Sequence, residues 1–213
     1  MIERIKKALA PFVTNVEEAE EKNLIFFDPA QLKELEQEAA PMVGLFAEVV
    51  EEKIGELVHA LLYANDLNKH KESKDIEPID FYISTYGGSA DDMFALYDVM
   101  RVVRERTPIH TVGLGKVMSA GVLILAAGTE GERKIAKNCR IMIHSVMGGN
   151  QGDLHNMLNE MEAIEQLQQM FIDCLVSETK LTKSRLKKML ERKVNVYLSA
   201  EEAVELGIAD III

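Results

Sequence analysis

The sequence is short of basic residues and of cysteine. Lysine and arginine together number 24 against 35 acidic residues, which gives a formal net charge of −11. This balance argues against nucleic acid or an anionic membrane as a partner. The two cysteines, Cys139 and Cys174, stand far apart without a CxxC motif, and the chain opens with MIERIKK rather than a signal sequence. A reducing cytoplasm is therefore the expected location.

Long apolar runs and metal motifs are also missing. No apolar run approaches the ~18 residues of a membrane span, so no membrane contact is expected. The five histidines form no HExxH motif and no pairing with cysteine, which predicts no metal site. With 213 residues and 47% hydrophobic residues, the chain is long enough for one domain with a substantial core, spanning residues 1–213.

The most informative stretch is Gly113–Gly128, which reads GLGKVMSAGVLILAAG. A strand, His110–Leu114, is predicted to end at Gly115, and a helix of small residues is predicted from about Ser119. Ser119 would then lie where a strand meets a helix. The first peptide N–H groups of a helix have no internal partner, so they could stabilise an oxyanion formed by attack of this serine.

Strands and helices alternate along the chain from residue 79 onward. The predicted strands are Ile79–Ser84, His110–Leu114, Arg133–Ala136, Arg140–His144 and Ile208–Ile213. The predicted helices are Ala90–Arg106 with Ser89 as N-cap, the Ser119 helix, Asp153–Thr179, Thr182–Glu191, and a last helix opened by a capping box at Ser199. This alternation predicts largely parallel strands with helices on the faces of the sheet.

The first 50 residues are harder to interpret. They suggest short helices at Ile5–Leu9 and Ala30–Ala40, an apolar β-type run at Asn23–Phe27, and a strand at Gly44–Val50 before a helix at Glu51–Asn65.

The helix predicted at Asp153–Thr179 is long for a single domain. Its 27 residues would span roughly 40 Å. Apolar residues recur along it every three or four positions, which predicts that at least one face is buried and that the helix reaches into another subunit. Met157, Met161 and Met170 are accordingly assigned to packing in the core or, if the family resemblance described below holds, between rings.

His144 ends the apolar run RIMIH, just before a glycine-rich loop. Taken alone, it is more simply a strand-terminal histidine bonded to backbone. Together with Ser119 and the Gly87-Gly88 turn, it could complete a set of nucleophile, general base and oxyanion donors.

Four blocks carry a resemblance that covers about residues 79–213. They are STYGGSADDMFALYDVM (84–100), GKVMSAGVLILAAGTEGER (115–133), RIMIHSVMGGNQG (140–152) and YLSAEEAVELGIAD (197–210). In this order they resemble the proteolytic subunit of the Clp protease, ClpP. The resemblance implies an α/β fold, a repeated ββα superhelix with a head (51–152 and 180–213) and a protruding handle helix (153–179), after a divergent segment 1–50.

The resemblance also implies roles for individual residues. Ser119 would be the nucleophile and His144 the general base, with the N–H groups of Gly88 and Ala120 as oxyanion hole. Substrate would be bordered by Ser89, Val146, Met147 and Gly148, where an extended peptide adds as a strand.

Assembly and partners follow from the same resemblance. Members of this family form seven-membered rings that stack in pairs around a chamber, fed with unfolded polypeptide by an AAA+ unfoldase of the ClpX, ClpA or ClpC type. The unfoldase uses ATP, and the proteolytic subunit needs no cofactor of its own. This chain accordingly contains no P-loop.

The chain departs from the family pattern at the third member of its triad. The family has an aspartate four residues before the Ser-Ala pair, and here that position is Asn195. An asparagine can orient an imidazole but cannot stabilise its charged form, which predicts reduced activity. Asp173, Glu191 or Glu201 could compensate.

Two further departures are Tyr86, where the family has a proline before the Gly-Gly pair, and an apparent insertion within residues 1–50.

Two alternatives from other functional classes stay open. One is a weakly active or inactive ring subunit that assembles with an active paralogue, which Asn195 favours. The other is a crotonase-like acyl-CoA enzyme, which shares the fold and the paired N–H groups but has no required place for a Ser119–His144 pair.

Overall fold

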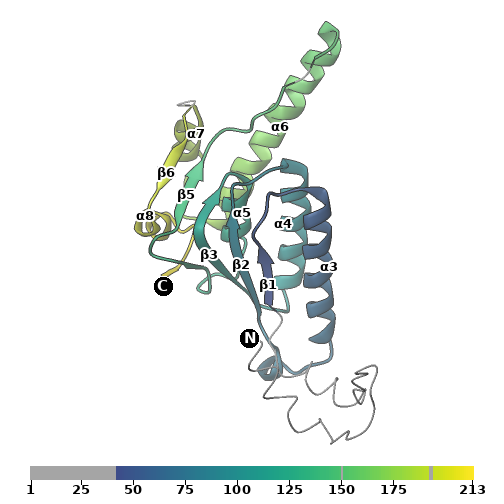
Figure 1. The fold of residues 1–213 in the computed structure, drawn as a ribbon, viewed down its shortest axis with the longest axis vertical. Coiled ribbons are helices and arrows are strands. Elements are labelled where there is room, and N and C mark those ends of the chain that lie inside the picture. Colours follow the sequence, from purple (N-terminus) through teal and green to yellow (C-terminus); the bar gives the residue numbers. More distant parts are fainter. Residues whose placement is uncertain (1–41, 150, 192–193) are drawn as a thin grey trace, which may run out of the picture. The chain divides into compact units, whose positions relative to one another are not determined.

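The computed structural model describes residues 42–149, 151–191 and 194–213 (Figure 1). These residues belong to one compact unit, Ala39–Ile213. The short helices predicted at Ile5–Leu9 and Ala30–Ala40 and the apolar run Asn23–Phe27 lie outside the described residues. The assignment of the whole chain to a single domain stays a prediction.

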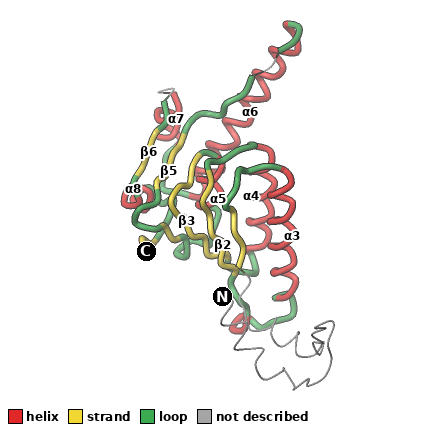
Figure 2. Tube along the Cα trace, viewed as in Figure 1, coloured by secondary structure: helices red, strands yellow, loops and turns green. Residues whose placement is uncertain are grey.

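The fold class is confirmed: helices and strands alternate around a mostly parallel sheet (Figure 2). The strands are β1 (Met42–Leu45), β2 (Ile79–Thr85), β3 (Ile109–Met118), β4 (Lys134–Ile135), β5 (Arg140–Ile143), β6 (Val196–Leu198) and β7 (Ile211–Ile212). The α-helices of the described residues are α3 (Glu51–Leu67), α4 (Ala90–Arg104), α5 (Ala120–Ala126), α6 (Leu154–Glu178), α7 (Lys183–Glu191) and α8 (Ala200–Glu205). A 3₁₀ turn, η2 (Ser73–Asp75), precedes β2.

The sheet runs in the order β1-β2-β3-β4-β7, and β5 and β6 branch from β3. All neighbouring strands are parallel except β5 and β6, which are antiparallel. A helix lies between each of the first parallel pairs, α3 between β1 and β2 and α4 between β2 and β3. This is the connection expected of parallel strands, which cannot be joined by a tight turn.

Strand β3 is longer than predicted, because Gly115 redirects the strand instead of ending it. Gly115 has φ 63°, a left-handed conformation that glycine adopts without strain. Before it, Val112 and Gly113 pair with β4, and after it Lys116, Val117 and Met118 pair with β5. The bend thus allows one strand to serve two neighbours and carries the chain on to Ser119.

The core lies between the sheet and helices α3, α4 and α5. Residues of β2 are alternately buried and half-buried, as expected of a strand with one face toward a core. The predicted stripe of α4 is confirmed, since Met93, Tyr97, Met100 and Val103 are all buried. Helix α4 begins as predicted, with the Ser89 hydroxyl accepting the Asp92 N–H at 3.2 Å.

Helix α6 confirms the predicted long helix but not its fully buried face. Phe171, Ile172 and Leu175 in its C-terminal half are buried, whereas the apolar residues of its N-terminal half are exposed within this chain. The exposed residues are Leu154, Met157, Leu158 and Met161. Figure 1 shows this half extending away from the sheet. Met157, Met161 and Met170 are exposed, so they are not part of the core of this chain, and their packing against another subunit stays a prediction.

Smaller differences concern the ends of the sheet. Strand β6 was not predicted, because its three residues adjoin the polar segment around residues 192–195. Strand β1 begins and ends earlier than the predicted Gly44–Val50, and β7 is shorter than Ile208–Ile213. The capping box at Ser199 is confirmed. Among the described residues, no helix is long and apolar enough to cross a membrane.

Candidate active site

Ser119 lies at the junction of β3 and α5 in a strained backbone conformation. It has φ 54° and ψ −123°, and among the described residues it is the only one other than glycine with positive φ. Its N–H donates to the Met142 carbonyl at 2.8 Å, which anchors it to the adjacent strand. A strained non-glycine residue persists only where its surroundings enforce it, and such residues gather at functional sites.

His144 meets Ser119 from the next strand. It directly follows β5, and the parallel register pairs Met118 with Met142. The carboxyl ends of two adjacent strands thus bring the side chains together, with His144 Nε2 2.8 Å from Ser119 Oγ. Both residues are half-buried. At this distance a neutral imidazole can accept the hydroxyl proton as the oxygen attacks an electrophile.

The Gly87-Gly88 turn packs directly against this pair. A Cβ on Gly87 would lie 2.6 Å from Ser119 Cβ and 3.1 Å from the Ala120 nitrogen, so only glycine allows this approach. Gly87 also has φ 99°. Within the described residues, the N–H groups of Gly88 and Ala120 donate to no acceptor. Gly88 follows the glycine that contacts Ser119, and Ala120 follows Ser119 itself, so these two free donors are the candidates for an oxyanion hole.

Two residues that the sequence did not single out hold this turn. Val49 forms two backbone hydrogen bonds with the turn. Its N–H donates to Gly87 O and its carbonyl accepts the Ser89 N–H, both at 2.8 Å. Thr85 Oγ1 accepts the Gly87 N–H at 3.0 Å and donates to Ala47 O at 2.6 Å. Thr85 offered a weak signal, a threonine just before a Gly-Gly turn. The Val49 contact had none, because it depends on main chain alone.

Asn195, the predicted third member, makes no hydrogen bond with His144 within the described residues, and it is exposed. The antiparallel register of β5 and β6 pairs Ile143 with Val196, so one further step sets His144 opposite Asn195. Opposite residues of an antiparallel pair project to the same side. If this register continues by one residue, Asn195 faces the same side as His144, although its amide makes no hydrogen bond with the ring within the described residues.

None of the three candidate replacement acids contacts His144. Asp173 forms an exposed ion pair with Lys183 at 2.7 Å, whose hydrogen bond lowers the pKa of Asp173. Glu201 lies in the first turn of α8, where hydrogen bonds to the backbone lower its pKa. Glu191 lines a cavity beyond Ser145.

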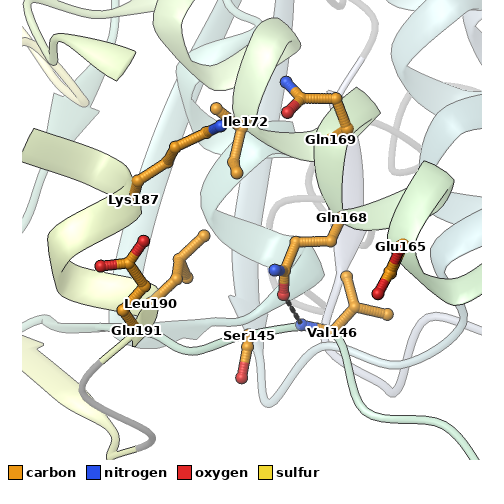
Figure 3. Close-up of a pocket in the computed structure, with 9 residues that line it drawn as sticks. All are labelled: Ser145, Val146, Glu165, Gln168, Gln169, Ile172, Lys187, Leu190 and Glu191. Atoms are coloured by element: carbon orange, nitrogen blue, oxygen red, sulfur yellow. Dashed lines mark hydrogen bonds between the residues drawn. The ribbon is translucent and has the colours of Figure 1, made fainter. Parts of the chain in front are cut away.

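A cavity of about 440 Å³ opens beyond His144, between α6 and α7. It is lined by Ser145, Val146, Glu165, Gln168, Gln169, Ile172, Lys187, Leu190 and Glu191 (Figure 3). Gln168 reaches across from α6, and its Oε1 accepts the Val146 N–H at 3.2 Å. The main chain at Val146 therefore borders a space large enough for a side chain of an extended peptide.

The other predicted substrate residues are placed differently. Met147 is highly exposed. Gly148 packs against α6, since a Cβ there would lie 2.5 Å from Ile164 Cδ1. The Ser89 side chain is occupied as the cap of α4.

The cysteines do not offer a competing nucleophile. Burial raises the pKa of Cys139 to about 11 and also raises that of Cys174. Both thiols are therefore protonated at neutral pH, and it is the thiolate that attacks.

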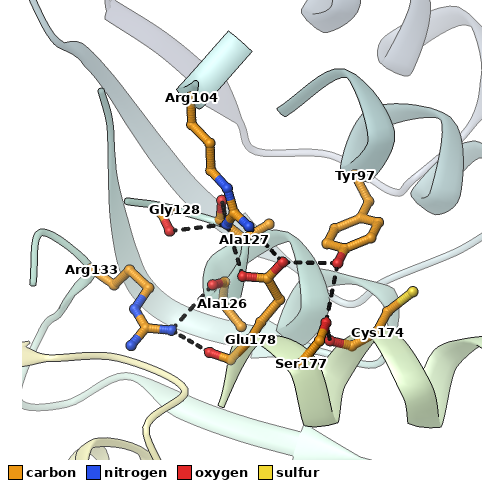
Figure 4. A network of polar contacts seen from close by, with 9 residues as sticks. All are labelled: Tyr97, Arg104, Ala126, Ala127, Gly128, Arg133, Cys174, Ser177 and Glu178. Carbon is orange, nitrogen blue, oxygen red and sulfur yellow. Dashed lines mark hydrogen bonds and ion pairs between the residues drawn. The ribbon is translucent and has the colours of Figure 1, made fainter. Parts of the chain in front are cut away.

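A second polar cluster lies where α4, α5 and the end of α6 meet (Figure 4). Arg104 binds both carboxylate oxygens of Glu178 at 2.8 and 2.7 Å, which raises the pKa of Arg104. The Tyr97 hydroxyl donates to the same carboxylate at 2.8 Å, and burial raises the pKa of Tyr97 to about 12. Arg133 binds both oxygens of Asp210 at 2.7 and 2.6 Å and also donates to the Glu178 carbonyl. The charges of this cluster are thus matched within the chain.

Comparison with known families agrees with this geometry. A family model described as Clp protease matches residues 33–213, far more than half of the chain.

Proposed function

The chain belongs to the Clp protease family, and from that premise we propose that it is a serine endopeptidase with Ser119 as nucleophile and His144 as general base. The observation that carries the proposal is the 2.8 Å contact of Ser119 Oγ with His144 Nε2, beside two free peptide donors. In the first step Ser119 Oγ attacks the scissile carbonyl carbon, and its proton passes to His144 Nε2.

The remaining steps use the same groups. The negative charge on the carbonyl oxygen is stabilised by the N–H groups of Gly88 and Ala120. When the tetrahedral intermediate collapses, the C–N bond breaks and His144 gives its proton to the leaving amine. Water then attacks the acyl-serine, with His144 as base, to release the acid and restore Ser119.

We further propose that the substrate is an unfolded polypeptide, which adds as an extended strand beside Val146 and places a side chain in the cavity between α6 and α7. Such binding uses main-chain hydrogen bonds and reads few side chains. The exposed apolar residues of α6 support assembly into rings that stack in pairs through this helix. Delivery of substrate by an AAA+ unfoldase remains a prediction from the family, and a cytoplasmic location remains a prediction from the sequence.

The proposal is tested by steady-state cleavage of a short fluorogenic peptide by the full-length, size-fractionated protein. Ser119→Ala is expected to lower kcat by about 10⁴-fold or more, because nothing replaces the nucleophile. Ser73→Ala, at an exposed serine of η2 remote from the site, is the matched control and should leave kcat unchanged. Equal cleavage by wild type and Ser119→Ala would overturn the assignment.

A second candidate function is favoured by the state of Asn195. Because this side chain is exposed and does not bond His144 within the described residues, the chain could serve as an inactive ring subunit beside an active paralogue. Co-expression separates the two proposals. If hydrolysis appears only in mixed rings and survives Ser119→Ala in this chain, the scaffold role is correct.

A further inference from the structure

A second cavity, of about 540 Å³, shares no lining residue with the one between α6 and α7. Its lining includes Tyr86, Lys116, Met118, Arg140, Met142 and Tyr197. These residues come from the segment after β2 and from strands β3, β5 and β6. Nothing in the reaction scheme above uses them.

The cavity is adjacent to the reacting groups through covalent and hydrogen-bonded neighbours. Met118 directly precedes Ser119, and Tyr86 directly precedes Gly87. The Met142 carbonyl accepts the Ser119 N–H at 2.8 Å. A molecule in this cavity therefore lies next to the nucleophile and the oxyanion donors.

The two cavities lie to either side of His144 along the same stretch of chain. Arg140 and Met142 precede His144 at two-residue intervals, which puts the three side chains on one face of the strand. Ser145 and Val146 of the other cavity follow His144. If a peptide cut at Ser119 runs along this stretch, the two cavities would receive its residues on opposite sides of the scissile bond.

The charge of this second cavity is uncompensated. Lys116 and Arg140 are register partners on adjacent parallel strands. Within the described residues, neither side chain forms an ion pair or a hydrogen bond. No lining residue is acidic. The cavity therefore carries two positive charges that no carboxylate of its own lining balances.

Aromatic rings hold both cations in place. Lys116 Nζ lies 4.6 Å from the centre of the Tyr86 ring, and Arg140 Cζ lies 4.8 Å from that of Tyr197. These cation–π contacts fix the side chains without neutralising them. The hydrogen-bond donors of both groups remain available to an anionic ligand.

We propose that this cavity is a specificity subsite that binds a carboxylate of the peptide substrate. The inference rests on the proposed peptidase function for the identity of its ligand. Arg140 supplies a planar fork for the two oxygens and Lys116 a second positive charge, while the tyrosine rings contact the aliphatic part of the peptide. The carboxylate is either an Asp or Glu side chain or the carboxyl terminus of the peptide.

The spacing along β5 limits where the carboxylate lies. Arg140 and His144 are four positions apart, or roughly 13 Å of extended chain. The preferred ligand is therefore an acidic group within about four residues of the scissile bond, on the side of the bond where the substrate passes Arg140.

Binding is measured on the full-length Ser119→Ala protein, so that the result does not depend on hydrolysis. The first set consists of pairs of fluorescein-labelled decapeptides, with Glu or isosteric Gln at one position on either side of a fixed central residue. A further pair carries only Gln, and its two members end in a free carboxylate or an amide. Fluorescence anisotropy gives Kd for each peptide.

The acidic member of one pair is expected to bind about tenfold more tightly than its neutral partner, a difference that charge-assisted hydrogen bonds commonly provide. The preference should disappear in Lys116→Gln/Arg140→Gln and persist in part in Arg140→Lys, which keeps the charge. Lys69→Gln, at an exposed lysine that does not line the cavity, is the control for net charge and should change nothing. A preference confined to the free-acid pair identifies the carboxyl terminus as the source.

Equal Kd values for all acidic and neutral partners, or a preference that survives the double substitution, would overturn the inference. The proposed peptidase function is judged separately, by hydrolysis in the wild type. If the protein binds carboxylate peptides preferentially but never cleaves a peptide, the proposed peptidase function is wrong and the carboxylate-binding site is still supported.

Discussion

Two polar clusters in this chain differ in how far their hydrogen bonds are satisfied. In the first cluster, Arg104 binds the Glu178 carboxylate through two nitrogens, and Arg133 binds the Asp210 carboxylate in the same way. The charges of each pair cancel. Around Ser119, the N–H groups of Gly88 and Ala120 find no acceptor within the described residues, and the serine backbone is strained.

The difference separates structure from function. A buried polar group left unpaired costs free energy, so a saturated cluster stabilises the fold and leaves nothing for a ligand. Free donors beside a strained nucleophile have no structural use and are available to a reacting carbonyl. Substitutions in the first cluster should therefore change stability, and substitutions in the second should change turnover.

The largest effect is expected from Gly87→Ala. The new Cβ would press on Ser119 and displace the oxyanion donors, lowering kcat by roughly 10²–10³-fold. Gly131→Ala is the matched control, because Gly131 also has positive φ, 88°, yet a Cβ there meets nothing within 4 Å. Both variants should lose stability through backbone strain, Gly87→Ala more because of its contacts, and only Gly87→Ala should lose turnover. Equal kcat values would show that the turn is not part of the site.

Next in size is Glu178→Ala, which leaves Arg104 without its carboxylate and Tyr97 without an acceptor. Both side chains of the ion pair are largely buried, so the free energy of unfolding should fall by about 3 kcal/mol. Asp173→Ala removes an exposed ion pair and should not shift the urea midpoint. If the assembled Glu178→Ala protein lost turnover but no stability, the division between the clusters would be wrong.

A smaller effect is expected from Asn195→Asp. A carboxylate opposite His144 can orient the ring and stabilise the imidazolium, so kcat should rise at least about tenfold. Asn159→Asp makes the same charge change on the exposed half of α6 and should be neutral. An unchanged kcat in both would mean that position 195 does not reach the imidazole.

The smallest effect concerns acid stability. Burial by itself would raise the pKa of Asp210, but hydrogen bonds from Arg133 and Gly131 and the charge of Arg133 outweigh it and lower the pKa. Stability from this carboxylate is thus present above its unfolded pKa of about 3.9 and is lost as the pH falls through the lower folded value.

The urea midpoint of the wild type should accordingly fall more steeply below about pH 4 than that of Asp210→Asn. Parallel pH profiles for the two proteins would contradict this assignment.

The sequence predicted the parts of the site that depend on local order. Alternating strands and helices put Ser119 and His144 at strand ends, and the structure brings them within hydrogen-bond distance. Their catalytic roles stay predictions. The contact of Val49 with the Gly87-Gly88 turn could not be predicted, because it consists of backbone hydrogen bonds between segments distant in sequence. Likewise, Lys116 and Arg140 become neighbours only through the register of β3 and β5.

One boundary was misjudged and one prediction was incomplete, both for physical reasons. Gly115 was expected to end its strand, but a glycine inside a strand can also mark a bend, and Gly115 bends β3 between two partners. The apolar spacing of α6 predicts a buried face without saying which chain buries it, and the half around Met157 is not covered by its own chain.

The most direct test of the account is covalent labelling of the full-length, size-fractionated protein with a fluorophosphonate probe. The modified residue is located by peptide mass, in the wild type and in Ser119→Ala and His144→Ala. The account predicts one phosphonylated residue, Ser119, with no labelling in Ser119→Ala and strongly slowed labelling in His144→Ala. A correctly assembled wild type that stays unlabelled, or that is labelled at another residue, would contradict it.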